Sequence, residues 1–139
     1  MFGSITIANG GTLRIDNGGT VTVKVSLEGV IISNNGLITN AGTLNLDNTG
    51  KDIGIDNLAT LTNTGTIYTK GGAGYGIANE GGTFTNNGII DLHGPDGIHN
   101  IDLSASVFFD NYGSLTIEVF SMDSITTLAV SSTRNARGA

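Results

Sequence analysis

The stretch at residues 60–69, TLTNTGTIYT, decides the fold, because close copies of it recur along the chain. The copies read LITNAGTLNL at residues 37–46 and TFTNNGIIDL at residues 83–92. Each copy places an asparagine two residues before a glycine and then continues with alternating apolar residues. A phrase repeated at a fixed spacing indicates a structural unit that stacks on copies of itself.

The repeated asparagines are 23 residues apart, except for a last interval of 25 residues. They are Asn17, Asn40, Asn63, Asn86 and Asn111. The glycines that follow them are Gly19, Gly42, Gly65, Gly88 and Gly113. Apolar residues precede the asparagines at Ile15, Ile38, Leu61, Phe84 and Phe109, and follow the glycines at Val21, Leu44, Ile67, Ile90 and Leu115. A second, weaker Ile-x-Asn phrase occurs at residues 7–9, 32–34, 55–57, 77–79 and 98–100.

The apolar residues alternate with a period of two, as in Leu44 and Leu46, which is typical of strands and not of helices. We therefore predict an all-β protein, a parallel β-helix of about five three-sided coils over residues 1–117. A right-handed winding follows from the usual hand of parallel crossovers. Residues 118–139 leave the repeat, and we expect them to form a strand-like tail that caps the stack or contacts another subunit.

The asparagines share the inward parity of their apolar neighbours, so we expect all five to lie inside the coil. A buried amide must be hydrogen-bonded, and an asparagine in register with another can donate to one neighbour and accept from the next. The sequence thus predicts an asparagine ladder. We expect the glycines to form corners that need a positive φ.

Composition excludes several classes of protein. The net charge is −6, and the six Lys and Arg residues are scattered, so a nucleic-acid partner is not expected. No apolar run reaches the length of a membrane helix, and no cysteine is present to bind metal as a thiolate. His93, Asp96 and His99 lie close in sequence, but two histidines on a turn are usually solvated, so we predict neither a metal nor a cofactor.

The strings ITNAGTLNLDNTG, LTNTGTIYT and GYGIANEGGTFTNNG resemble the Asn-x-Gly-Thr-Ile repeats of bacterial surface adhesins, of the filamentous-haemagglutinin-like and autotransporter-passenger kind. The resemblance covers residues 4–117. It implies a right-handed parallel β-helix and an extracellular or cell-surface setting. It also implies a stalk or scaffold role, with a surface glycan or a host protein as a candidate partner.

Three functions stay open at this point. Polysaccharide-cleaving enzymes also use β-helices, but the acidic residues here do not recur in one register and the loops between repeats are short, so we predict no catalytic activity. A stalk or binding module of an adhesin is the alternative. The favoured function is a structural subunit that stacks end to end on copies of itself into an extracellular fibre.

The prediction of end-to-end stacking rests on the ends of the repeat region, because a stack of coils leaves unpaired strand edges at both ends. Apolar residues at each end would continue the internal columns across a joint between subunits. These residues are Phe2, Ile5 and Ile7 at the start, and Leu115, Ile117, Phe120, Ile125 and Leu128 at the finish.

Overall fold

The computed structural model describes residues 4–25, 29–48, 53–70, 75–93, 96–101, 108–121 and 124–131. Within these ranges the side chains at positions 25, 48, 96, 97, 99–101, 108, 109, 117–121 and 124–131 are not part of the description. The described chain consists of strands and turns and contains no helix.

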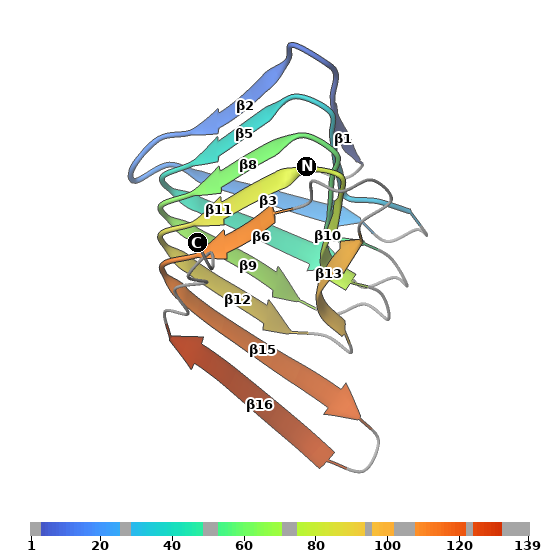
Figure 1. The fold of residues 1–139 in the computed structure, drawn as a ribbon, viewed down its shortest axis with the longest axis vertical. Helices are drawn as coiled ribbons and strands as arrows, with labels where there is room; N and C mark the ends of the chain where they lie inside the picture. Colours follow the sequence, from blue (N-terminus) through green and yellow to red (C-terminus); the bar gives the residue numbers. More distant parts are fainter. Residues whose placement is uncertain are drawn as a thin grey trace, which may run out of the picture.

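The strands form three sheets, and successive strands of the chain visit the sheets in turn (Figure 1). The first sheet holds β1 (Ile5–Ile7), β4 (Ile32–Asn34), β7 (Ile55–Asn57), β10 (Tyr75–Glu80) and β13 (Asp96–Ile101). The second sheet holds β2 (Thr12–Ile15), β5 (Leu37–Asn40), β8 (Thr60–Asn63), β11 (Thr83–Asn86) and β14 (Phe108–Asn111). The third sheet holds β3 (Thr20–Val25), β6 (Thr43–Asn48), β9 (Thr66–Lys70), β12 (Ile89–His93), β15 (Ser114–Ser121) and β16 (Ser124–Ser131).

Strands β1 to β15 pair in parallel with their counterparts one coil away, as the repeat predicts. The all-β parallel β-helix is therefore confirmed, with about 23 residues in each turn. Figure 1 shows the strands of each sheet stacked like rungs along the long axis. The right-handed winding stays a prediction.

Apolar columns fill the interior of the coil. The column predicted from Val21 to Leu115 is present, with Leu44, Ile67 and Ile90 in register and fully buried. A neighbouring column on the same sheet runs through Val23, Leu46, Thr69 and Leu92. Aligned aliphatic side chains of this kind bury apolar surface in every coil, and each fully buried Leu or Ile contributes about 1.5–3 kcal/mol.

The first coil departs from the predicted register. Ile15 pairs with Asn40, and not with Ile38, whose partner is Leu13. Asn17 is exposed in a turn with Gly18, so its predicted place in the ladder is wrong. The sequence contains two extra corner residues at this point. Asn-Gly readily makes a tight turn, and Gly18 has a φ of 79°, so the extra residues bulge outward and shift the strand before them.

The corner glycines are needed for a different reason from the predicted one. Among the described glycines, Gly42, Gly65, Gly88 and Gly113 do not have a positive φ. A Cβ on Gly65 would instead collide with the backbone carbonyl oxygen of Gly42 in the preceding coil. That oxygen accepts a hydrogen bond from the Thr66 N–H at 2.8 Å, which fixes the close approach of the two corners.

The last strand reverses direction. β16 pairs antiparallel with the whole length of β15, from Ser114 opposite Ser131 to Ser121 opposite Ser124. The boundary expected between residues 117 and 118 therefore lies inside β15. β16 extends the third sheet by one strand below the coil stack (Figure 1).

Candidate functional site

The asparagine ladder of the second sheet is the most regular polar feature of the interior. Asn40, Asn63, Asn86 and Asn111 stand in register on β5, β8, β11 and β14, and the first three are fully buried. The Nδ2 of Asn40, Asn63 and Asn86 each donates to the Oδ1 of the asparagine in the next coil, at 2.7–2.8 Å. The predicted ladder is thus confirmed at these four positions.

The amides of Asn40, Asn63 and Asn86 also donate to main-chain carbonyl oxygens of the next coil. Asn40 Nδ2 donates to the carbonyl oxygen of Thr66 at 2.9 Å, and Asn63 Nδ2 donates to that of Ile89 at 3.1 Å. Because every amide points in the same direction along the stack, the ladder has a donor end and an acceptor end.

A second ladder runs along the first sheet. Asn34 Nδ2 donates to Asn57 Oδ1, and Asn57 Nδ2 donates to Asn79 Oδ1, both at 2.7 Å. The Ile-x-Asn phrase was the sequence signal for these residues. That phrase was the weaker of the two repeats, and the predicted site did not include its asparagines.

Both ladders stop at isoleucines in the first coil. Ile15 is the register partner of Asn40, and Ile7 is the partner of Asn34. Asn40 Oδ1 is consequently buried without a hydrogen-bond partner. At the other end of the second sheet, Asn111 Nδ2 is the buried donor without a partner.

The two ends of the stack expose apolar side chains. Ile5, Leu13 and Val21 in the first coil are only partly buried, whereas Ile32, Ile38 and Leu44 one coil further in are fully buried. Ile98 in the last coil is also partly buried. Within the described residues, no further coil packs against the columns to which these side chains belong.

The predicted end residues have different positions. Ile5 is partly exposed, but Ile7 and Leu115 are 6% and 7% exposed and belong to the core. Ile117 and Phe120 lie on β15, and Ile125 and Leu128 lie on β16, with side chains outside the described part. Phe2 also lies outside the described residues. The role of these residues in assembly stays a prediction.

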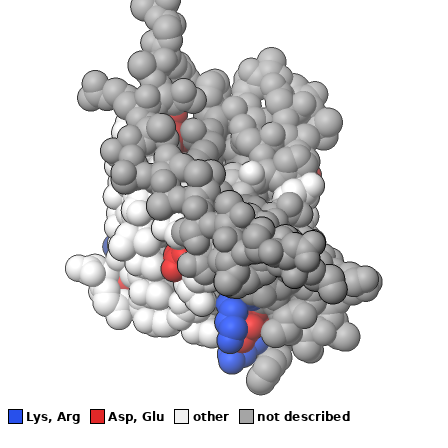
Figure 2. Space-filling model, turned by 90° about the horizontal axis from the view of Figure 1, so that it is seen from below, with Lys and Arg blue, Asp and Glu red and all other residues white. Residues whose placement is uncertain are grey.

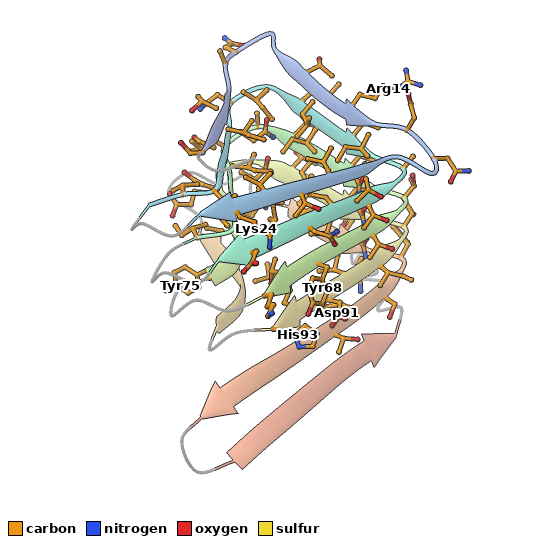
Figure 3. All side chains as sticks on the ribbon, turned by 180° about the vertical axis from the view of Figure 1, so that it is seen from behind. Arg14, Lys24, Tyr68, Tyr75, Asp91 and His93 are labelled. Atoms are coloured by element: carbon orange, nitrogen blue, oxygen red, sulfur yellow. The ribbon has the colours of Figure 1, made fainter. Side chains whose placement is uncertain are left out.

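The outer face of the third sheet carries a row of charged and polar side chains. Lys24 Nζ lies 3.4 Å from Asp47 Oδ2, and Asp47 is in register with Lys70 on the next strand. Tyr68 leans toward His93, with ring centroids 5.1 Å apart, and His93 Nε2 lies 3.1 Å from Asp91 Oδ1 (Figure 3).

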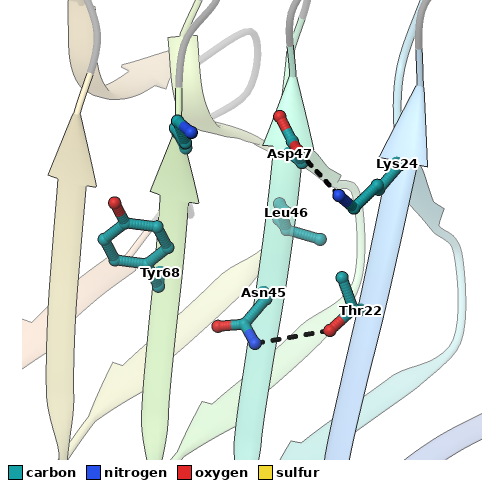
Figure 4. A pocket seen from close by; sticks show the side chains of 7 residues that line it. Thr22, Lys24, Asn45, Leu46, Asp47 and Tyr68 are labelled. Carbon is teal, nitrogen blue, oxygen red and sulfur yellow. Dashed lines mark hydrogen bonds and ion pairs between the residues drawn. The ribbon is translucent and has the colours of Figure 1, made fainter.

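A shallow hollow of about 260 Å³ opens on this face between Tyr68 and Lys24 (Figure 4). Its lining includes Asn45, whose amide donates to Thr22 Oγ1 at 3.4 Å, and Asp47. An aromatic ring beside amide, ammonium and carboxylate groups can bind a small polar ligand that also has an apolar face. This hollow is the candidate ligand site of the chain.

Among the described residues, charged side chains form no broad patch in the view from below (Figure 2). The largest visible group of Lys and Arg atoms lies beside an acidic side chain (Figure 2). Among the described residues, no group of three or more His, Asp or Glu side chains could hold a metal ion. Asp96 and the His99 side chain of the sequence-based cluster lie outside the described side chains.

One carboxyl group on the first sheet has an unusual environment. Burial raises the pKa of Asp56 above its ordinary value of 3.8, and the negative charge of Glu80 raises it further. Asp56 Oδ1 is buried without a hydrogen-bond partner. This carboxyl group therefore favours its protonated form more than a solvated aspartate does.

The fold and these features define a small parallel β-helix with two hydrogen-bonded asparagine ladders and partly exposed apolar side chains in its first coil. No described helix has the length and hydropathy of a membrane span. The chain matches no protein-family model, no curated protein and no solved structure.

Proposed function

We propose that this chain is a non-catalytic structural subunit that assembles end to end with copies of itself into an extracellular fibre. The observation that carries the proposal is the partial exposure of Ile5, Leu13 and Val21 at one end of the stack. These are the residues that a further coil would bury. The extracellular setting is supported only by the resemblance of the repeats to those of surface adhesins.

Strand edges support the same proposal. In the described part of the chain, β1, β2 and β3 each have a strand partner on one side only. At the opposite end of the stack, β13 and β14 are the last strands of their sheets. Unpaired edge strands readily pair with another chain. A contact between unlike ends propagates as an open filament unless it closes into a ring.

The test compares two triple variants with the wild type. Replacing Ile5, Leu13 and Val21 by lysine places charge on the exposed end of the internal columns, so we expect monomers in light scattering and no fibres in negative-stain microscopy. The control replaces Asn35, Thr60 and Asn87, which are exposed on coils away from the open edge strands, by lysine. The control variant has the same charge and should still assemble.

Both variants must keep the wild-type far-UV circular dichroism spectrum for the comparison to count. A wild-type protein that stays monomeric at high concentration would overturn the proposal. So would a control variant that loses assembly to the same extent as the end variant.

A second candidate function is a binding module for a surface glycan, and the hollow beside Tyr68 favours it. Sugar rings present apolar faces to aromatic rings and hydroxyls to amides and carboxylates, and Asn45 and Asp47 supply such groups here. We expect Tyr68→Ala to abolish binding in a glycan-array or calorimetric assay. Tyr112→Ala is the matched control, because Tyr112 is 55% exposed and does not line the hollow.

A further inference from the structure

The three sheets differ in their number of strands. In the described part of the chain, the first and second sheets each contain five strands, whereas the third contains six, because β16 is added below β15. Strands in a sheet are about 4.8 Å apart, so the third sheet is about 4.8 Å taller than the other two. Two such subunits stacked end to end cannot close the gap in all three sheets at once.

We propose that the third sheet makes the joint, with β16 of one copy pairing antiparallel with β3 of the next copy. This inference rests on the proposed end-to-end assembly and specifies its contact. The occupant of the open β3 edge is thus a second copy of this chain. The first and second sheets then face each other across a space one strand wide.

The inward columns of the third sheet differ from those of the other two. In the first and second sheets an asparagine column ends at an isoleucine of the first coil, at Ile7 and Ile15. Among the described residues, the third sheet carries no asparagine ladder, and the columns of Val21 and Val23 are apolar except at Thr69. Val21 itself is only partly buried.

The register of β16 matches those apolar columns. Val130 pairs with Leu115, which stands in the column of Val21, and Leu128 pairs with Ile117, which stands in the column of Val23. A second copy placed below β16 would therefore bring its Val21 to Val130 and its Val23 to Leu128. Both internal columns would continue through the joint.

Strand length also favours β3. It has six residues, whereas β1 has three and β2 has four. β16 has eight residues, so it can cover the whole edge of β3. Main-chain hydrogen bonds formed along the full strand give such a contact its affinity.

A joint through one sheet makes the assembly bend. The six strands of the third sheet space successive subunits about 29 Å apart. The five strands of each other sheet favour a spacing of about 24 Å. We therefore expect curved filaments or closed rings, and not straight fibres, in negative-stain images.

Cysteine cross-linking tests the joint directly, because the chain contains no cysteine. The proposed register places Thr22 of one copy opposite Ala129 of the other. A mixture of Thr22→Cys and Ala129→Cys proteins should therefore give a disulfide-linked dimer on mild oxidation. Within one chain these positions are five strand spacings apart, about 24 Å, which is too far for a disulfide.

The contrasting pair is Thr22→Cys with Thr116→Cys. These positions would meet only if β16 were displaced and β3 continued the parallel stack directly on β15, since both belong to one outward column. Cross-linking of this pair in place of the first would overturn the inference but leave end-to-end assembly standing. Absence of assembly in the wild type, measured by light scattering, would overturn both.

Discussion

The asparagine ladder gives the sharpest stability prediction. Replacing Asn63 by leucine keeps the size of the side chain nearly unchanged but removes its hydrogen bonds. Three of these are short: one accepted from Asn40 Nδ2 at 2.8 Å, one donated to Asn86 Oδ1 at 2.7 Å, and one donated to the Ile89 carbonyl at 3.1 Å.

A buried hydrogen bond contributes about 1 kcal/mol net, so the loss of three costs about 3 kcal/mol. In each neighbour the atom that loses a bond keeps one partner, since Asn40 Nδ2 still donates to the Thr66 carbonyl and Asn86 Oδ1 still accepts from the Gly88 N–H. The buried leucine returns about 1.5 kcal/mol of apolar transfer free energy, the low end of the range for a buried aliphatic side chain. We therefore expect Asn63→Leu to lower the free energy of unfolding by about 1.5 kcal/mol.

The assay is denaturant unfolding followed by far-UV circular dichroism, with two controls. Asn87→Leu changes an exposed corner residue and should lie within about 0.5 kcal/mol of wild type. Asn111→Leu removes one ladder bond but also the unpartnered Nδ2, so its cost should fall between the other two. A midpoint for Asn63→Leu equal to that of Asn87→Leu would refute the argument that the ladder stabilises the coil.

Two further predictions concern single residues. Gly65→Ala should destabilise the fold by about 3 kcal/mol or more, because its Cβ would meet the Gly42 carbonyl. Gly18→Asn should be nearly neutral, because Asn tolerates a positive φ and the space around Gly18 is open. A comparison of the two melting midpoints with that of the wild type checks this prediction. Stability should fall as the pH rises from about 3.8 through the raised pKa of Asp56, because the folded state holds that proton more tightly. Asp56→Asn should remove this pH dependence in urea titrations, and an unchanged profile would argue against the assignment.

Much of the coil could be predicted from sequence because each level repeats the same local chemistry. The spacing of Asn40, Asn63 and Asn86 predicted where the strands lie and which residues face inward. It also predicted the hydrogen-bonding partners of these three amides. The second ladder was visible as a phrase but was given less weight, since the asparagines of that phrase recur at intervals that vary from 21 to 25 residues.

The first coil could not be placed in the same way. The sequence is compatible with two alignments, Asn17 with Asn40 or Ile15 with Asn40. Both are possible because the corner that follows β2 can hold two more residues than the corresponding corner of the next coil. Packing decides between them: in the observed register Ile15 is 3% exposed in the core, and the Asn17 amide lies in solvent, where it needs no protein partner.

The sequence by itself determined the class of the fold, since a period of 23 residues with apolar alternation can bury its side chains only by stacking coils. Tertiary structure alone decided how the stack ends. Whether residues 124–131 add to a sheet, and in which direction, depends on which strand edge the chain meets after its turn. The same holds for the glycines: a local reading predicts a positive φ at Gly65, whereas the constraint comes from the Gly42 carbonyl, 23 residues earlier in sequence and one coil away in space.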